Sequence, residues 1–315
     1  MNTTTDCRRL HRIGIAYMAL AAITFPVKDS FLKAQDERVP ALLAVAVYFA
    51  AQASFGQAGL FVTGHRARWN PFRGMTRLHL LRSLTITCSL ATFFFSLRYV
   101  PLSTAITLFT LQGLFCIGFG RVILGEPILP RHILLVFIAT VGVCLVARPS
   151  AGSGSIFINL VPLLSGAFGG LYIVVTRRLG MNQSPFQLVC QDGTVACLSV
   201  LIIYLAGMQM SGWPLPPVLL DWEVFLVPPV TAAVIGMVSS LGMIRAAQLA
   251  PAAKLAPASY LEIASGALIG IFIFGEFLDW LTLSGIVIIV GVCLTNTLLN
   301  ELEARDAATI DFPKM

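Results

Sequence analysis

The sequence has few charged residues. Only 11% of its 315 residues are Asp, Glu, Lys or Arg, whereas 57% are hydrophobic. A soluble domain carries about 25% charged residues, so this chain has too few polar side chains to cover a globule in water. A protein whose surface faces lipid needs far fewer of them. The shortage of charge therefore excludes an ordinary soluble protein and favours one that crosses a membrane many times.

Several chemical signatures are missing as well. The seven cysteines form no CxxC pair and mostly fall inside apolar stretches, so we interpret them as small packing residues. The four histidines have no metal-ligand spacing, and the GSG stretch at 152–154 lacks the surroundings of a phosphate-binding loop. We therefore predict no metal, no cofactor and no nucleotide site, so any transport must use a gradient. The net charge of +6 is better explained by the basic loops of a membrane protein than by a nucleic-acid partner.

Long apolar stretches are abundant instead. A transmembrane helix needs about 20 mostly apolar residues, and ten stretches approach or exceed this length. They run over 12–32, 40–62, 78–98, 102–124, 131–148, 156–176, 185–206, 222–244, 252–274 and 281–299. The first stretch is too long, and with Lys28 and Asp29 too charged, to be a cleavable signal peptide. The predicted fold class is an all-α integral membrane protein with ten transmembrane helices.

Basic residues are distributed unevenly between the two sides of this arrangement. With the N-terminus in the cytoplasm, sixteen of the 21 Lys and Arg residues, including Arg82, fall on the cytoplasmic side. Five, including Lys28 and Lys33, fall on the far side. Because basic residues concentrate in cytoplasmic loops, we predict a multi-pass protein of the inner membrane with both termini in the cytoplasm.

The chain repeats itself half its length apart. The pentapeptide VGVCL occurs at 141–145 and again at 290–294. The segments before the two copies each begin at a proline and reach Gly-Glu after the same number of residues, at 125–126 and 275–276. The second copy lies five helices further along the chain, and because this offset is odd, the copies run in opposite directions across the membrane. Such inverted repeats are typical of secondary transporters, in which two similar halves move around a central site.

The repeat divides the chain into two predicted halves of five helices each. The first half covers 1–150, the second covers 151–300, and 301–315 form a polar cytoplasmic tail. Each repeat carries a glutamate at its Gly-Glu step, Glu126 and Glu276. We expect these glutamates to shape a tight turn and to meet the N-terminus of a neighbouring helix, where negative charge is favoured, rather than to touch substrate.

Longer segments of each half resemble a known family. The stretch FSLRYVPLSTAITLFTL, continued by LGEPILPRHILLVFIATVGVCLVARPS, resembles the first half of an EamA-type member of the drug/metabolite transporter superfamily. The stretch RAAQLAPAAKLAPASYLEI, continued by FGEFLDWLTLSGIVIIVGVCL, resembles the second half. The resemblance extends over nearly the whole chain. It implies ten helices in two inverted halves that transport metabolites such as amino acids and related compounds.

Polar residues inside the predicted helices are the candidates for substrate binding or coupling, because charges in a membrane are costly and usually functional. Glu262 lies near the middle of the ninth span, and the 150-residue offset of the repeat pairs it with Gln112 in the fourth. Two roles stay open for Glu262. It binds a cationic group of the substrate or carries a proton, or it forms a hydrogen bond with Gln112 that holds the helices together.

The remaining candidates lie at the predicted external mouth and along the helices. Asp29 and Lys33 are one helical turn apart, so we expect them to form an ion pair or a charged lip that water reaches. Asp192 interrupts the seventh span and is expected to face a cavity or another helix. The other candidates are aromatic or hydroxyl residues near the middle of spans, namely Tyr48, Tyr172, Tyr260, Thr110 and Ser259. Each hydroxyl is more often a contact between helices than a ligand contact.

These features predict a secondary active transporter that moves a small polar metabolite, amino-acid-like or related, across the inner membrane by alternating access. The lipid bilayer and a small-molecule substrate are the expected partners, and the protein is expected to act as a monomer or weak homodimer. Two alternatives stay open at this point. One is an intramembrane enzyme, although no helix pairs a nucleophile with a base. The other is a membrane sensor that binds a ligand without transporting it.

Overall fold

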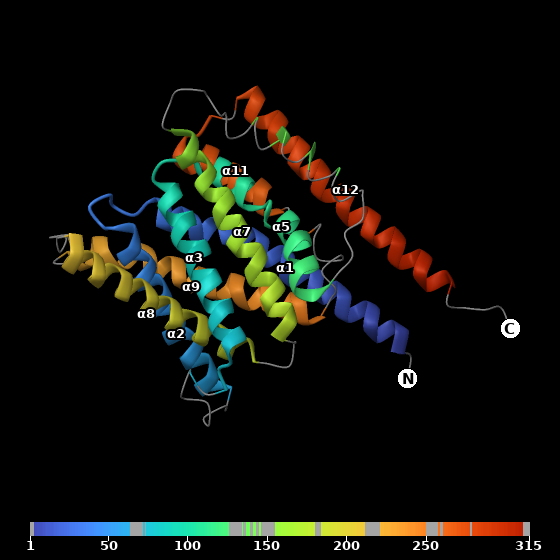
Figure 1. Ribbon diagram of the computed structural model, residues 1–315, viewed down its shortest axis with the longest axis horizontal. Coiled ribbons are helices and arrows are strands. Elements are labelled where there is room, and N and C mark those ends of the chain that lie inside the picture. The colour runs from blue at the N-terminus through green and yellow to red at the C-terminus, as the bar shows by residue number, and fades with distance from the viewer. Residues whose placement is uncertain are drawn as a thin grey trace.

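The computed structural model describes residues 3–63, 72, 74–125, 155–179, 184–211, 221–249, 258, 261–277 and 279–310, together with isolated positions between 134 and 145. All regular elements within these residues are helices (Figure 1). The predicted fifth helix falls almost wholly outside the described residues. Glu126, Ser259 and Tyr260 also lie outside the described residues.

The first half contributes three long helices and a divided fourth. Helix α1 covers Thr3–Lys33, α2 covers Ala41–Val62 and α3 covers Arg77–Leu97. The predicted fourth span consists of α4 at Leu102–Phe109, α5 at Gln112–Phe119 and a π-helical turn, η2, at Gly120–Leu124. Thr110 and Leu111 form the turn between α4 and α5. The prediction of one unbroken helix is therefore wrong at this point.

The helices of the second half fall within or overlap the predicted spans, and of the first nine residues of the predicted span 252–274 only Ala258 is described. Its helices are α7 at Ser155–Leu179, α8 at Pro185–Ser211, α9 at Trp222–Leu249, α11 at Leu261–Phe274 and α12 at Trp280–Ile310. Segments of α1, α2, α3, α8 and α9 have the length and composition of membrane spans, and α7, α11 and α12 contain shorter apolar segments. Because α12 continues to Ile310, most of the predicted polar tail is helical.

Local sequence explains where several helices begin. Pro40 and Pro101 directly precede α2 and α4, and both have an extended backbone that does not continue a helix backwards. Proline is also the first residue of α8, where its missing N–H costs nothing. Helix α3 begins with a capping box, in which the backbone N–H of Thr76 donates to His79 Nδ1 at 3.2 Å.

The two halves pack on each other symmetrically, so that a contact between two helices recurs between their counterparts in the other half. Helix α1 packs on α9, and their counterparts α7 and α3 pack on each other. Helices α2 and α8 are counterparts that pack together, as α4 and α11 do. Figure 1 shows α2 beside α8 and α3 beside α7, with α12 along the edge of the molecule. The core therefore lies where the halves meet.

Helices α4 and α11 run in opposite directions. Ser103, near the start of α4, lies beside Gly270, near the end of α11, and Ile106 lies beside Gly266. The glycines of the two Gly-Glu steps also share a left-handed backbone, because Gly125 and Gly275 have φ angles of 75° and 63°. Only glycine adopts this left-handed backbone without strain. The inversion predicted from the five-helix offset of the repeat is confirmed for this pair.

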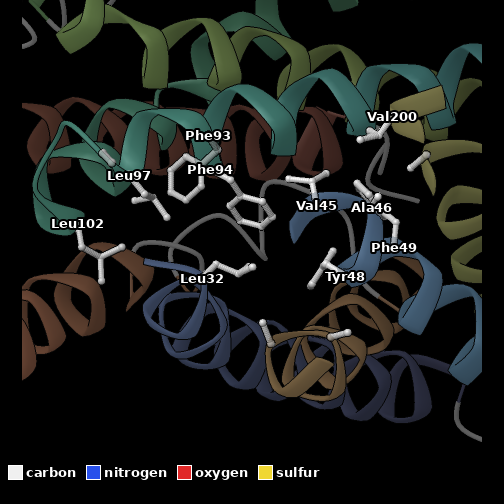
Figure 2. Packing of buried hydrophobic residues seen from close by; sticks show 14 of the residues in the cluster. Leu32, Val45, Ala46, Tyr48, Phe49, Phe93, Phe94, Leu97, Leu102 and Val200 are labelled. Atoms are coloured by element: carbon white, nitrogen blue, oxygen red, sulfur yellow. The ribbon is translucent and has the colours of Figure 1, made fainter. Parts of the chain in front are cut away.

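The largest apolar cluster fills the space between the halves. Phe94 of α3 and Tyr48 of α2 point into the same interior, with ring centroids 5.8 Å apart (Figure 2). Phe49 packs edge-on against Tyr48 at 5.3 Å, and Phe93 packs on Phe109 at the same distance. Edge-to-face rings of this kind stabilise a core beyond the area that they bury. Ala232 and Ala233 of α9 complete the cluster from the second half.

Candidate functional site

A buried ion pair lies near the end of α1. Lys28 Nζ is 2.5 Å from Asp29 Oδ1, and both residues are only 2% exposed. The ammonium lies 5.6, 5.7 and 5.3 Å from the ring centroids of Phe25, Tyr48 and Phe94, which attract a cation. Adjacent residues of a helix do not face each other. The close pair therefore lacks hydrogen-bond geometry, and Asp29 Oδ1 has no hydrogen-bond partner in the described part of the chain.

The predicted pair between Asp29 and Lys33 is wrong. Lys28 pairs with Asp29, although we assigned Lys28 to a different face of the helix, because its long side chain folds back. Lys33 instead pairs with Glu276, which the end of α11 brings next to it. Asp29 is also too deeply buried to form the lip that we expected water to reach.

Glu262 lies in the first turn of α11 and is 7% exposed. It lies near enough to Asp29 and Lys28 for their charges to interact, although the side chain of Glu262 forms no ion pair or hydrogen bond with any residue that the structure describes. Two carboxylates and one ammonium thus share this part of the described structure. The group carries one excess negative charge unless one carboxylate holds a proton.

Gln112 does not form the predicted hydrogen bond with Glu262 in the described structure. Gln112 faces α7, where a Cβ added at Gly169 would lie 2.7 Å from its Oε1. The hydroxyls of the fourth span do not reach Glu262 either. Thr107 donates to the carbonyl of Ser103 at 2.7 Å, and Thr110 likewise donates one turn back, to Ile106, at 2.8 Å. These hydroxyls satisfy their own helix instead, as is common for Ser and Thr inside helices.

Tyr48 brings α2 into the same site. Its hydroxyl accepts a hydrogen bond from Gln52 Nε2 at 2.9 Å. Helix α9 covers this contact at Gly236, where an added Cβ would lie 2.5 Å from the Tyr48 hydroxyl and 2.9 Å from Lys28 Cδ. The missing side chain of Gly236 therefore allows α9 to approach the polar groups of α1 and α2.

A second buried charge cluster joins α3, α7 and α8. Arg82 is 0% exposed, and its Nη1 and Nη2 lie 3.0 and 2.9 Å from the two carboxylate oxygens of Asp192. Nη2 also donates to the Tyr172 hydroxyl at 2.6 Å, and Nε donates to Thr176 Oγ1 at 2.9 Å. Ser83 and Tyr172 donate to Asp192 at 2.8 and 3.2 Å. We call these five residues the Arg82 cluster.

The Arg82 cluster was only partly predictable from the sequence. Tyr172 and Asp192 were separate candidates, whereas Arg82 was assigned to the cytoplasmic side. A signal was present, since Arg82 falls inside the predicted span 78–98 and begins a run of buried hydroxyl residues at Ser83, Thr85 and Thr87. Polar residues that are buried within an apolar helix face other helices. The cluster adjoins the first site, because Gly193, next to Asp192, packs closely against the backbone of Phe49, next to Tyr48.

A third polar contact lies where α1 and α11 end and α4 begins. Glu276 Oε1 pairs with Lys33 Nζ and accepts the backbone N–H of Leu102 at 2.6 Å. Its Oε2 accepts the N–H and the hydroxyl of Ser103 at 3.1 and 2.8 Å. We call this arrangement the Glu276 contact. The prediction that Glu276 meets a neighbouring N-terminus is confirmed, and Glu126 lies outside the described residues.

The charge of Glu276 is stabilised by these donors. Burial raises the pKa of a carboxyl group, but the hydrogen bonds from Lys33, Leu102 and Ser103 outweigh this effect. The pKa of Glu276 is therefore lower than its usual value, and Glu276 is ionised at neutral pH.

Two similar helical halves with buried charges where they meet are the architecture of a membrane transporter built from a structural repeat. Comparison of the sequence with family models gives the same result for each half separately. The EamA-like transporter family matches residues 12–148 and again 153–298. The chain belongs to this family.

Individual relatives are transporters as well. The chain is 27% and 26% identical to the pseudopaline exporter CntI of two Pseudomonas aeruginosa strains, over 90% of this chain and 96% of each exporter. It is 24% identical to a riboflavin transporter of Brucella anthropi over 48% of this chain and 52% of that protein. A solved crystal structure has the same fold, with a TM-score of 0.60 and 16% identity over 92% of this chain and 96% of that one. The protein is therefore a membrane transporter, and the alternative of an intramembrane enzyme is set aside.

Proposed function

We propose that this protein is a secondary active transporter that exports a small polar metabolite across the inner membrane by alternating access. The observation that carries the proposal is the group of charges formed by Lys28, Asp29 and Glu262, which is buried where α1, α9 and α11 of the two halves meet. Similarity to an exporter over most of the chain supports the direction of transport.

The excess negative charge of this group determines how the site works. An isolated ionised carboxylate inside a membrane costs several kcal/mol, and the ammonium of Lys28 offsets the charge of only one of the two carboxylates. A proton on Glu262, or a cationic group of the substrate beside it, balances the other. Glu262 therefore binds either the coupling proton or a cationic group of the substrate during the cycle.

The distribution of charge supports an orientation with both termini in the cytoplasm. Lys28 and Arg82 are buried inside helices, so neither is a loop residue. Leaving them out removes one basic residue from each side of the membrane, and the cytoplasmic side keeps its excess of basic residues. Helix α1 begins and α12 ends toward the same end of the molecule in Figure 1. The side where α1 ends is then external.

The proposal is tested by flux into liposomes that contain the purified protein. Labelled amino acids, pseudopaline and riboflavin are supplied, since the last two are the cargoes named for relatives. We expect at least one solute to cross in unchanged form, and to accumulate when a proton gradient is imposed. Binding of a solute with no flux above that of empty liposomes would instead identify a membrane sensor.

Glu262→Gln tests the coupling. The amide keeps the shape of the side chain but cannot titrate, so we expect normal folding, loss of proton-driven accumulation, and continued exchange of solute down its own gradient. Gln112→Ala is the matched control at the repeat-related position, and it should retain accumulation because Gln112 faces α7. Full accumulation in Glu262→Gln would rule out the coupling role.

A further inference from the structure

We propose that Glu276 is a gating residue of the transport cycle and that Lys33 is its counter-ion. The carboxylate closes the side of the protein where α1 ends by joining the two halves, and it releases α4 when that side opens. This inference rests on the proposed alternating-access function. It concerns a glutamate whose place in the repeat predicts only that it shapes a turn and meets the end of a helix.

The Glu276 contact crosses the boundary between the halves. Glu276 follows α11 of the second half, whereas Lys33, Leu102 and Ser103 belong to α1 and α4 of the first. A single carboxylate thus receives one ammonium, two backbone N–H groups and one hydroxyl from the opposite half. If the halves move relative to each other to expose the centre on this side, these bonds must separate.

The backbone on both sides of the Glu276 contact positions the groups that form it. The left-handed turn at Gly275 folds the chain back, and the N–H of Glu276 donates to the carbonyl of Gly270 at 2.9 Å. The carboxylate lies directly over Gly270, where an added Cβ would collide with Oε2. On the other side, α4 is only eight residues long and is separated from α5 by the turn at Thr110 and Leu111. A short helix with a turn at its far end can tilt as a unit once its first N–H groups are released.

The exposure of the charges is suited to repeated opening. The side chains of Lys33 and Glu276 are 16% and 9% exposed, and they lie at helix ends next to a loop. When the contact separates, water can solvate both charges, so opening does not strand an ion inside the protein. A contact made of the same groups deep in the membrane would be too costly to break in every cycle.

On the opposite side, the described residues show a contact of a different kind. Arg178 lies near the end of α7, as Lys33 lies near the end of α1. Its Nη1 donates to the carbonyl of Ile123, at the end of the repeated fourth span, at 2.9 Å, and Arg178 is exposed. Glu126, the repeat-related counterpart of Glu276, lies outside the described residues. The Glu276 contact on the α1 side is formed in the described structure. We infer that this conformation is closed on the external side.

The test measures access of water-borne reagent to a buried position beneath the contact. Ile106 is 0% exposed and lies one turn along α4 from Leu102. The variant Ile106→Cys in liposomes is treated with a membrane-impermeant maleimide, and labelling at residue 106 is read by peptide mass spectrometry, which separates it from the seven native cysteines. Adding Glu276→Gln should speed labelling at least about tenfold, since loss of a charge-assisted hydrogen bond shifts an equilibrium by that factor or more.

Two controls separate gating from general loosening. Thr87→Cys, a buried position of α3 on the side of the Arg82 cluster, should label equally slowly with and without the Glu276→Gln substitution, because that cluster is untouched. A reducible cross-linker long enough to replace the two side chains, joined to Lys33→Cys and Glu276→Cys before the maleimide is added, should abolish labelling at residue 106 until it is cleaved. Unchanged labelling in Glu276→Gln, or an equal increase at residue 87, would overturn the gating role.

This test needs no transported solute, so its result is independent of the flux assay. A protein that shows flux in liposomes but no effect of Glu276→Gln on labelling would retain the proposed function and lose the gate. A protein with no flux that still opens at residue 106 would lose the proposed function while the contact remains a moving part.

Discussion

The Arg82 cluster and the Glu276 contact both hold the two halves together by an ion pair, but they differ in what surrounds the charges. Arg82 is fully enclosed, and each of its three guanidinium nitrogens donates to a residue of α7 or α8. Glu276 lies at the end of a helix, with its partner Lys33 partly exposed. Burial decides the cost of separating two charges, so the first arrangement is suited to a permanent connection and the second to one that opens.

The largest effect should come from breaking the Arg82 cluster. Arg82→Met leaves the Asp192 carboxylate buried without its counter-ion, and removing one partner of a buried ion pair costs about 3–5 kcal/mol. We expect a large fall in the thermal unfolding temperature of the purified protein in detergent. The double variant Arg82→Met with Asp192→Leu should recover most of the loss, because it removes both charges. Unfolding of Arg82→Met at the wild-type temperature would show that the cluster is not a structural connection.

A much smaller loss of stability is expected when the Glu276 contact is broken. Lys33→Met removes an ion pair that water partly reaches, and such pairs contribute about 1 kcal/mol or less. The three hydrogen bonds from Leu102 and Ser103 to Glu276 remain. We therefore expect a shift of the unfolding temperature well below that of Arg82→Met. A loss as large as that of Arg82→Met would remove the distinction between the two clusters.

The Glu276 contact should not change its protonation state near neutral pH. The pKa of Glu276 is lowered in the folded protein, so the stabilisation that the carboxylate provides is fully present above its unfolded pKa of about 4.3 and is lost as the pH falls through the lower folded value. Between pH 5 and 8 hydrogen exchange of the Leu102 and Ser103 amides, corrected for the intrinsic rate, should be constant. Exchange that accelerates within this range would show that the contact titrates near neutrality.

The smallest effect is expected at an exposed pair in the loop after α1. Asp36 Oδ2 is 2.7 Å from Arg38 Nη2, and this partner lowers the pKa of Asp36 to about 2 through side-chain and backbone hydrogen bonds. The pair joins no helices of different halves, and water screens it. Asp36→Asn should leave both the unfolding temperature and labelling at Ile106→Cys unchanged. An effect of Asp36→Asn on labelling would mean that any charge near the external loop alters access.

Much of the architecture follows from the sequence alone. The apolar lengths predict helices such as α2 and α9, and the repeated Gly-Glu steps predict two similar halves. The odd, five-helix offset between the repeats predicts that α4 and α11 run in opposite directions. These features depend on composition and spacing along the chain, and each is imposed by the thickness and dryness of the membrane. They need no knowledge of which helices touch.

The partners of the charged residues were decided only by the tertiary structure. Spacing along one helix suggested that Asp29 pairs with Lys33, but Lys33 pairs with a residue 243 positions away, and Arg82 pairs with Asp192 across 110 positions. The repeat suggested that Gln112 meets Glu262, whereas their helices turn these side chains toward different neighbours. A buried charge takes the partner that packing brings within reach, because leaving it unpaired costs more than any local preference of the helix. The sequence determined which residues had to find partners, and the packing of helices from different halves determined which partners they found.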